Sequence, residues 1–315
     1  MPVSNDRLKE VVGFLMLHGT AKTLEAFSIP EETLNRYKRK YKQEFGDSSD
    51  IVGRIRDKFT DEQMEDLLAM DMSKRPKSKG NITFEGEDFK FLALSDTHIG
   101  SVYFEESYLM AAMSEAKRQG CTAMLHGGDV LEGMSTRPGQ IYELSQIGYA
   151  AQRNKAVELL KQWELPLYFI VGNHDIWGNT KSGVGMDVGE DLQLRIPNSK
   201  YLGVHEGNID VNGATFMLWH GEDGSSYASS YRVQKIIEAF TGGEKPQALF
   251  TAHTHKALYL FDRNVHAVST GSIQRQSGFM RYKRLAAHTG FWIVSGKVRD
   301  GEITQFTPTW YPFYK

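Results

Sequence analysis

Small polar residues follow five apolar segments of the sequence, each where the apolar run ends. KFLALS (90–95) leads into Asp96-Thr97-His98, and TAMLHG (122–127) leads into Gly128-Asp129. LYFIVG, ATFMLW and QALFTA lead into Asn173-His174-Asp175, His220-Gly221 and His253-Thr254-His255. Because ligands of an α/β sheet bind at the carboxyl ends of its strands, we expect these side chains to meet at one rim.

The polar residues at this rim are aspartate, asparagine and histidine, with no cysteine among them. Oxygen and imidazole donors without thiolate suit Mn²⁺, Fe or Zn²⁺ rather than a structural cysteine site. The number of candidate donors exceeds the needs of one ion and fits two ions that share a carboxylate. The candidate donors are Asp96, His98, Asp129, Asn173, His220, His253 and His255.

The order of these motifs resembles that of the calcineurin-like metallophosphoesterase superfamily, which is D-x-H, G-D, G-N-H-D/E, H and G-H-x-H. This sequence has DTH, GGD, GNHD, WHG and AHTH in the same order, and the resemblance covers about residues 88–275. Ala252 stands where the family usually has glycine, and both histidines after it are kept. The resemblance implies phosphoester hydrolysis by an α/β domain, folded as a four-layer α/β/β/α sandwich.

The resemblance also implies a metal-binding role for each candidate donor. Asp96, His98, Asp129 and His255 would hold one divalent ion, and Asp129, Asn173, His220 and His253 the other. Asp129 would then bridge the two ions. Mn²⁺ is the leading expectation, with Fe and Zn²⁺ as alternatives. Two ions about 3.5–4 Å apart can generate a hydroxide nucleophile at neutral pH and bind phosphate oxygens.

Three further residues near the motifs have expected roles. His174 directly follows a predicted ligand, which makes it the natural general acid for the leaving oxygen, or a hydrogen-bond donor to the transition state. Glu132 lies where some family members carry an acidic partner for that histidine, and a carboxylate there would orient the imidazole and raise its pKa. The alternative is an exposed glutamate at a helix start. Asp175 is expected to cap a loop rather than to act in catalysis.

Strands and helices must alternate after Gly80 to position these motifs. Helices are predicted near 105–118 and 145–163, between the first strands, which is typical of an α/β layered domain. We therefore predict a catalytic domain at 81–315, preceded by a basic linker at 73–80 and a small all-α module at 1–72.

The N-terminal module is predicted to contain short helices over 5–18, 20–27, 31–45 and 60–71. The third helix is basic, and a helical trio of this kind is the outline of a helix-turn-helix DNA-binding module. The alternatives are a solvated charged face or a protein-docking domain. The basic residues are Arg36, Lys38, Arg39, Lys40 and Lys42.

Features outside the metal motifs point to DNA as the substrate. The segment GSIQRQSGFMRYKR (271–284) interleaves cations with Phe279 and Tyr282, a pattern that can hold phosphates and stack bases. Its cations are Arg275, Arg281, Lys283 and Arg284. The alternative for this segment is a β-hairpin with ordinary surface cations.

Two segments carry a finer resemblance within the superfamily. SDTHIG (95–100) is similar to the first motif of double-strand-break repair nucleases, in which homodimers are common. GDVLEGMSTRPGQIYEL (128–144) more weakly resembles the small exonuclease subunit of archaeal family-D DNA polymerases. Together they imply a Mn²⁺-dependent DNA phosphodiesterase. The rivals are a phosphomonoesterase, a small-molecule or protein phosphatase with a partner-binding module, and a non-enzymatic DNA-binding regulator.

Composition excludes several other classes of protein. A single cysteine, Cys121, cannot form a disulfide framework within the chain, and no window approaches the roughly 18 uninterrupted apolar residues of a membrane span. The first residues lack the basic-then-apolar order of a signal peptide. These features predict a soluble cytoplasmic protein.

Overall fold

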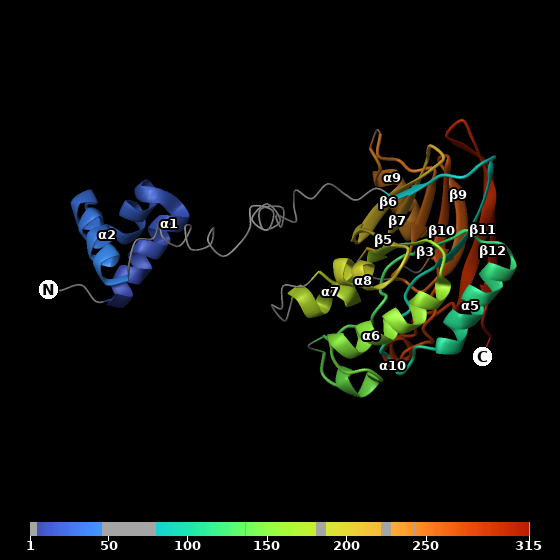
Figure 1. Ribbon diagram of the computed structural model, residues 1–315, viewed down its shortest axis with the longest axis horizontal. Coiled ribbons are helices and arrows are strands. Elements are labelled where there is room, and N and C mark those ends of the chain that lie inside the picture. The colour runs from blue at the N-terminus through green and yellow to red at the C-terminus, as the bar shows by residue number, and fades with distance from the viewer. Residues whose placement is uncertain are drawn as a thin grey trace. The chain divides into compact units, whose positions relative to one another are not determined.

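A computed structural model describes residues 5–45, 80–135, 137–180, 187–221, 228–241 and 243–314. The chain divides into two compact units, Met1–Pro76 and Lys77–Lys315, and each is described by itself (Figure 1). The predicted helix over 60–71 and residues 73–79 of the predicted linker lie outside the described ranges.

The N-terminal unit contains α1 (Asn5–Phe27) and α2 (Glu31–Phe45). The prediction of two separate helices before residue 28 was wrong, because helical hydrogen bonding continues through His18-Gly19. The rings of Phe14 and Phe27 nevertheless lie only 5.3 Å apart, whereas a straight helix would separate these residues by about 20 Å. We conclude that α1 bends sharply between them, in the stretch that holds the glycine.

Two six-stranded sheets form the larger unit, and their strand orders are β12-β11-β2-β3-β4-β5 (sheet 1) and β1-β6-β7-β8-β10-β9 (sheet 2). The strands of sheet 1 are β2 (Asp88–Leu94), β3 (Ala123–His126), β4 (Leu167–Val171), β5 (Ser199–Val204), β11 (Gly290–Arg299) and β12 (Glu302–Pro312). Those of sheet 2 are β1 (Gly80–Ile82), β6 (Glu206–Val211), β7 (Ala214–Trp219), β8 (Ala248–Thr251), β9 (Ala257–Asp262) and β10 (Val265–Thr270).

Helices cover the outer faces of both sheets (Figure 1). Sheet 1 packs against α5 (Glu106–Arg118), α6 (Tyr149–Leu160) and α8 (Val188–Arg195), and sheet 2 packs against α9 (Tyr231–Ala239). The remaining helices are α7 (Asn173–Thr180), α10 (Gly278–Tyr282), η1 (Gln140–Glu143) and η2 (Lys161–Trp163). The predicted four-layer α/β/β/α sandwich is thereby confirmed. Within the described ranges, no helix is both long and apolar enough to cross a membrane.

The central strand β2 shows why the motif strands have nearly continuous apolar sequences. Leu92 and Leu94 pack under the helices of sheet 1, whereas Phe91 and Ala93 pack between the two sheets. Successive side chains of a strand point to opposite faces, and here both faces are covered, so both must be apolar. The five predicted motif strands and the helices near 105–118 and 145–163 are confirmed.

Candidate metal centre and its cavity

The residues predicted to bind metal meet at the carboxyl ends of strands from both sheets. Strands β2, β3 and β4 run parallel in sheet 1 and lead into Asp96, Asp129 and Asn173. Strands β7 and β8 run parallel in sheet 2 and lead into His220 and the two histidines at 253 and 255. The face-to-face packing of the sheets brings the two sets of strand ends together.

The first group of donors contains Asp96, His98, Asp129 and His255. Nε2 of His255 lies 3.3 Å from Oδ1 of Asp96 and 3.2 Å from Nε2 of His98. Nε2 of His98 lies 3.8 Å from Oδ2 of Asp129. Asp96, His98 and His255 therefore point their donor atoms at one small volume, and His98 connects this cluster to Asp129.

The second group contains Asp129, Asn173, His220 and His253. Nε2 of His220 lies 3.2 Å from Oδ2 of Asp129 and 3.1 Å from Oδ1 of Asn173. Nδ1 of His253 lies 2.9 Å from the same Asn173 oxygen. The second group therefore shares the Asp129 carboxylate with the first.

The electrostatics and the free space of the two groups fit a pair of divalent cations. Oδ1 of Asp96 is buried without a hydrogen-bond partner, and burying a carboxylate in this way is costly unless a cation compensates it. Burial alone would raise the pKa of Asp96, but His255 and His220 together outweigh burial and hold the pKa below its usual value. A Cβ atom on Gly172 would lie 2.3 Å from Oδ1 of Asp129 and 2.5 Å from Nε2 of His220, so glycine keeps this space open.

The backbone of the donor residues is strained. Asp96, His98, Asp129, His253 and His255 all have φ between 48° and 70°. Residues other than glycine rarely adopt this left-handed region, and when they do, they cluster at functional sites held in place by surrounding structure.

Outer contacts orient two of the imidazoles. Nδ1 of His220 donates to the carbonyl oxygen of Gly127 at 2.8 Å, and Nδ1 of His98 lies 3.1 Å from Oε2 of Glu132. Each contact leaves Nε2 directed at the donor group, which is how second-layer partners orient metal-binding histidines. Burial alone would lower the pKa of His98, but the carboxylates of Glu132, Asp129 and Asp96 together outweigh burial and raise the pKa to about 9.

Glu132 lies beside His174, but its carboxylate makes the longer of two contacts. Nδ1 of His174 donates to the backbone carbonyl of Glu132 at 2.9 Å, whereas the Glu132 carboxylate is 3.9 Å away. Burial lowers the pKa of His174 to about 4 although Asp129 and Glu132 both act to raise it. The alternative of an exposed glutamate was wrong, because Glu132 is buried.

Asp175 caps the loops around the centre, as predicted. Its carboxylate accepts hydrogen bonds from the backbone N–H groups of Gly172, Val130 and Leu131 at 2.8 to 3.1 Å. These bonds connect the residues after β3 to those after β4, and so hold Asp129 and Asn173 at a fixed separation.

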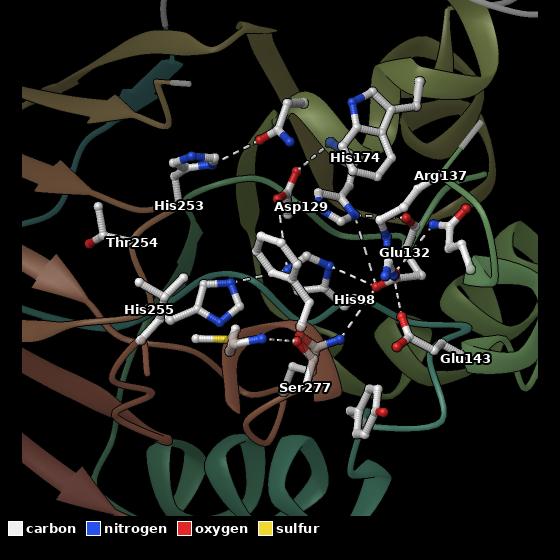
Figure 2. A pocket seen from close by; sticks show the side chains of 18 of the residues that line it. His98, Asp129, Glu132, Arg137, Glu143, His174, His253, Thr254, His255 and Ser277 are labelled. Carbon is white, nitrogen blue, oxygen red and sulfur yellow. Dashed lines mark hydrogen bonds and ion pairs between the residues drawn. The ribbon is translucent and has the colours of Figure 1, made fainter. Parts of the chain in front are cut away.

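A cavity of about 420 Å³ opens beside the two donor groups. Figure 2 shows His98, Asp129, His174 and His253 directed into it. The ring of Trp177 lies 3.8 Å from that of His174, and both residues come from α7. His174 is therefore held between the donor groups and an aromatic wall of the cavity.

The predicted DNA-binding cations are mostly exposed where the structure describes their side chains. Arg275, Arg281, Lys283 and Arg284 are exposed around α10 but do not line the cavity. On α2, Arg36, Lys38 and Arg39 are exposed and Lys40 is half-buried, whereas the side chain of Lys42 lies outside the description. The segment 271–284 is a short helix with flanking loops, so the alternative of a β-hairpin was wrong.

Several residues of the cavity wall were not singled out from the sequence. Arg137 and Glu143 form an ion pair there (Figure 2). Gln274 and Tyr103 also line the cavity. No motif marks them. The available signal was their position, because Arg137 and Glu143 belong to the segment that directly follows Asp129.

Comparisons with known proteins agree with this geometry. The sequence is 23% identical over 248 residues to the DNA polymerase II small subunit of Methanothermobacter thermautotrophicus, which covers 64% of this chain and 51% of the relative. It is 25% identical over 237 residues to the subunit of the same name from Archaeoglobus fulgidus, which covers 62% and 48%. The chain thus spans about half the length of these curated relatives.

An archaeal phosphodiesterase of known structure superposes with a TM-score of 0.43 at 12% identity, covering 71% of this chain and 100% of that one. A family model, described as calcineurin-like phosphoesterase, matches residues 89–257. Since that match takes in more than half of the sequence, as well as all seven residues of the two donor groups, this chain belongs to the calcineurin-like phosphoesterase family.

Proposed function

We propose that this phosphoesterase is a two-metal DNA phosphodiesterase, a nuclease. The observation that carries the proposal is the pair of donor groups that share Asp129 beside a cavity containing His174. Asp96, His98 and His255 would hold one divalent ion with Asp129, and Asn173, His220 and His253 the other. Such a pair of ions supplies a water of lowered pKa and neutralises charge on the phosphate. Mn²⁺ is the ion we expect.

His174 is the residue we assign to the leaving oxygen. Its backbone N–H donates to Oδ1 of Asp129 at 2.9 Å, which fixes its position relative to both donor groups. Because Nδ1 donates to the carbonyl of Glu132, Nε2 is the atom that meets the leaving oxygen, and it can protonate that oxygen only when the imidazole carries a proton on each nitrogen. Glu132 acts as a positioning residue, because its backbone carbonyl contacts His174 and its carboxylate contacts His98.

DNA as the substrate rests on support from outside the centre. Both curated relatives are named as small subunits of a DNA polymerase. The exposed cations of α2 and those around α10 give the chain two basic surfaces that can neutralise phosphates. A phosphatase acting on monoesters would need neither surface.

The first prediction concerns His174→Ala. We expect Mn²⁺-dependent cleavage of single-stranded or double-stranded DNA by the unmodified chain. In the variant, kcat should fall by roughly 10²- to 10⁴-fold, the usual contribution of a positioned acid or base, while Mn²⁺ affinity is retained. His288→Ala, at an exposed histidine outside the cavity, is the matched control. Turnover of p-nitrophenyl phosphate, with no cleavage of either DNA, would instead show a monoesterase.

A further inference from the structure

The cavity has an aromatic wall that the metal chemistry does not use. Phe279 lines the cavity from α10, yet 46% of its surface is exposed. Trp177 lines the same cavity from α7, and Met280 and Leu285 add apolar surface near Phe279. Hydrolysis of a phosphate ester does not need Phe279, Met280 or Leu285, so this part of the wall is available to contact an apolar, flat part of the substrate.

The position of Phe279 is fixed by its surroundings. Oγ of Ser277 accepts a hydrogen bond from the backbone N–H of Met280 at 3.2 Å, and the side chain of Met280 is buried. The guanidinium of Arg137 lies 5.9 Å from the centre of the Phe279 ring and is held there by its ion pair with Glu143. The ring is therefore presented to the cavity by anchored neighbours from two segments of the chain.

We propose that this cavity binds one unpaired nucleotide of the substrate, with its base against Phe279 and its phosphate at the donor groups. The inference rests on the proposed function and names the part of the DNA that is read. Bases stack on aromatic side chains whatever their sequence. The cavity volume, about 420 Å³, lies near the lower end of the roughly 300–1,000 Å³ typical of small-ligand pockets. An unpaired nucleotide exposes the face of its base to Phe279, whereas a base in a duplex is already stacked on its neighbours, so we expect the nucleotide to enter unpaired.

The test compares two substrates with the same leaving group. One is the p-nitrophenyl ester of thymidine 5′-monophosphate, and the other is methyl p-nitrophenyl phosphate, which has no base. The unmodified chain should prefer the nucleoside ester in kcat/KM. Phe279→Ala should lower kcat/KM for that ester by about 10-fold or more, as expected for one lost stacking contact, and leave the methyl ester unchanged. Phe279→Trp should restore the preference.

A matched control and a binding measurement complete the test. Phe261→Ala removes a phenylalanine that is 55% exposed on β9 and does not line the cavity, and should change neither rate. Isothermal titration of thymidine 5′-monophosphate against inorganic phosphate, both with Mn²⁺, gives the same comparison without turnover. Phe279→Ala should weaken binding of the nucleotide and leave binding of inorganic phosphate unchanged.

The outcomes separate this inference from the proposed nuclease activity. Equal binding and equal rates with and without the base, or a base preference that survives Phe279→Ala, would overturn the nucleotide cavity even if DNA is cleaved. If the base preference depends on Phe279 but DNA is not cleaved, the result would support the nucleotide cavity and reject the proposed nuclease activity. Cleavage of an oligonucleotide that slows about 10-fold when its reacting nucleotide is abasic would support both.

Discussion

The carboxylate of Glu132 contacts the imidazole of His98 on the side that faces away from the donor group. It does not contact a group that would react with the substrate. Its contact with Nδ1 of His98 is 3.1 Å long, and Nε2 of Gln274 lies 3.3 Å from the same carboxylate oxygen. These contacts hold His98 in the tautomer whose Nε2 can bind a cation. Glu132 should therefore govern metal affinity more than the chemical step.

Glu132→Gln tests this division of roles. We expect Mn²⁺ affinity, measured by isothermal titration calorimetry, to fall by about 10- to 100-fold, the usual cost of losing an outer partner of a metal-binding histidine. The rate at saturating Mn²⁺ should change little. Glu115→Gln, at a surface ion pair with Arg118, serves as the control. If Mn²⁺ affinity is unaltered but the rate falls strongly, the main role of Glu132 would instead be to position His174.

The residue types at the strand ends were sufficient to predict which side chains would meet, because ligand chemistry restricts them to Asp, Asn and His. The partner of Glu132 could not be predicted in the same way. Glu132 lies beside His98 because Ile99 and Leu131 form an isolated parallel bridge between the loops after β2 and β3. Such a bridge depends on backbone pairing between distant segments, and the spacing from Asp129 alone does not reveal it.

At the scale of elements, the turn between β4 and α7 sets the space within the second donor group. Gly172 lies at this turn, and a methyl group there would occupy the volume between Asp129 and His220. We expect Gly172→Ala to abolish binding at the second group, leaving at most one Mn²⁺ per chain by calorimetry. The far-ultraviolet circular dichroism spectrum should stay native.

The control for Gly172→Ala is Gly120→Ala, in the turn after α5. A Cβ there meets no atom within 4 Å, although φ is +76° and some strain is expected. This variant should lose stability but still bind two ions. Two ions bound by Gly172→Ala would mean that the cations lie elsewhere than between these donors.

Elements were predicted correctly where the local sequence pattern determines them. They were predicted incorrectly where packing or capping by other residues decides the structure. The motif strands were found because their two covered faces require continuous apolar runs. The bend of α1 was mistaken for a helix end, since a glycine lowers helix stability by only about 1 kcal/mol and packing can outweigh it. Short α10 was missed because its five residues are held by the Ser277 cap and by burial of Met280.

At the scale of the whole molecule, the donor groups join the carboxyl ends of two separate sheets. Cations bound there would oppose any separation of the sheets, and they bind the folded chain alone. With Mn²⁺ at 100 times its Kd, the free energy of unfolding should rise by about 2.7 kcal/mol. For a unit of this size that corresponds to an increase in Tm of roughly 5–10 °C.

Differential scanning calorimetry with EDTA and with Mn²⁺ measures this shift. The transition of the catalytic unit should move, and Gly172→Ala should show a smaller increase. An identical Tm in both buffers would contradict a centre that bridges the sheets.

The N-terminal unit contributes its exposed cations at the same scale. If Arg36, Lys38 and Arg39 contact phosphates, replacing all three with Gln should reduce the slope of log K against log salt by up to about 2.7 for duplex DNA, or 0.9 per contact. Fluorescence anisotropy of labelled DNA at several salt concentrations measures the slope. Replacing Arg118, Arg195 and Lys235, on outer helices of the catalytic unit, should leave it unchanged. If the slope changed only when Arg118, Arg195 and Lys235 were replaced, the DNA-binding surface would lie on the catalytic unit instead.

The left-handed backbone of the donor residues decides which variants report cleanly on charge. At Asp129, φ is +50°, a conformation that asparagine tolerates better than almost any other side chain. Asparagine is also nearly isosteric with aspartate, so Asp129→Asn neutralises the shared carboxylate with little change in main-chain geometry. Alanine at the same position would alter charge, volume and conformational preference together, and a loss of function could not be traced to one of them.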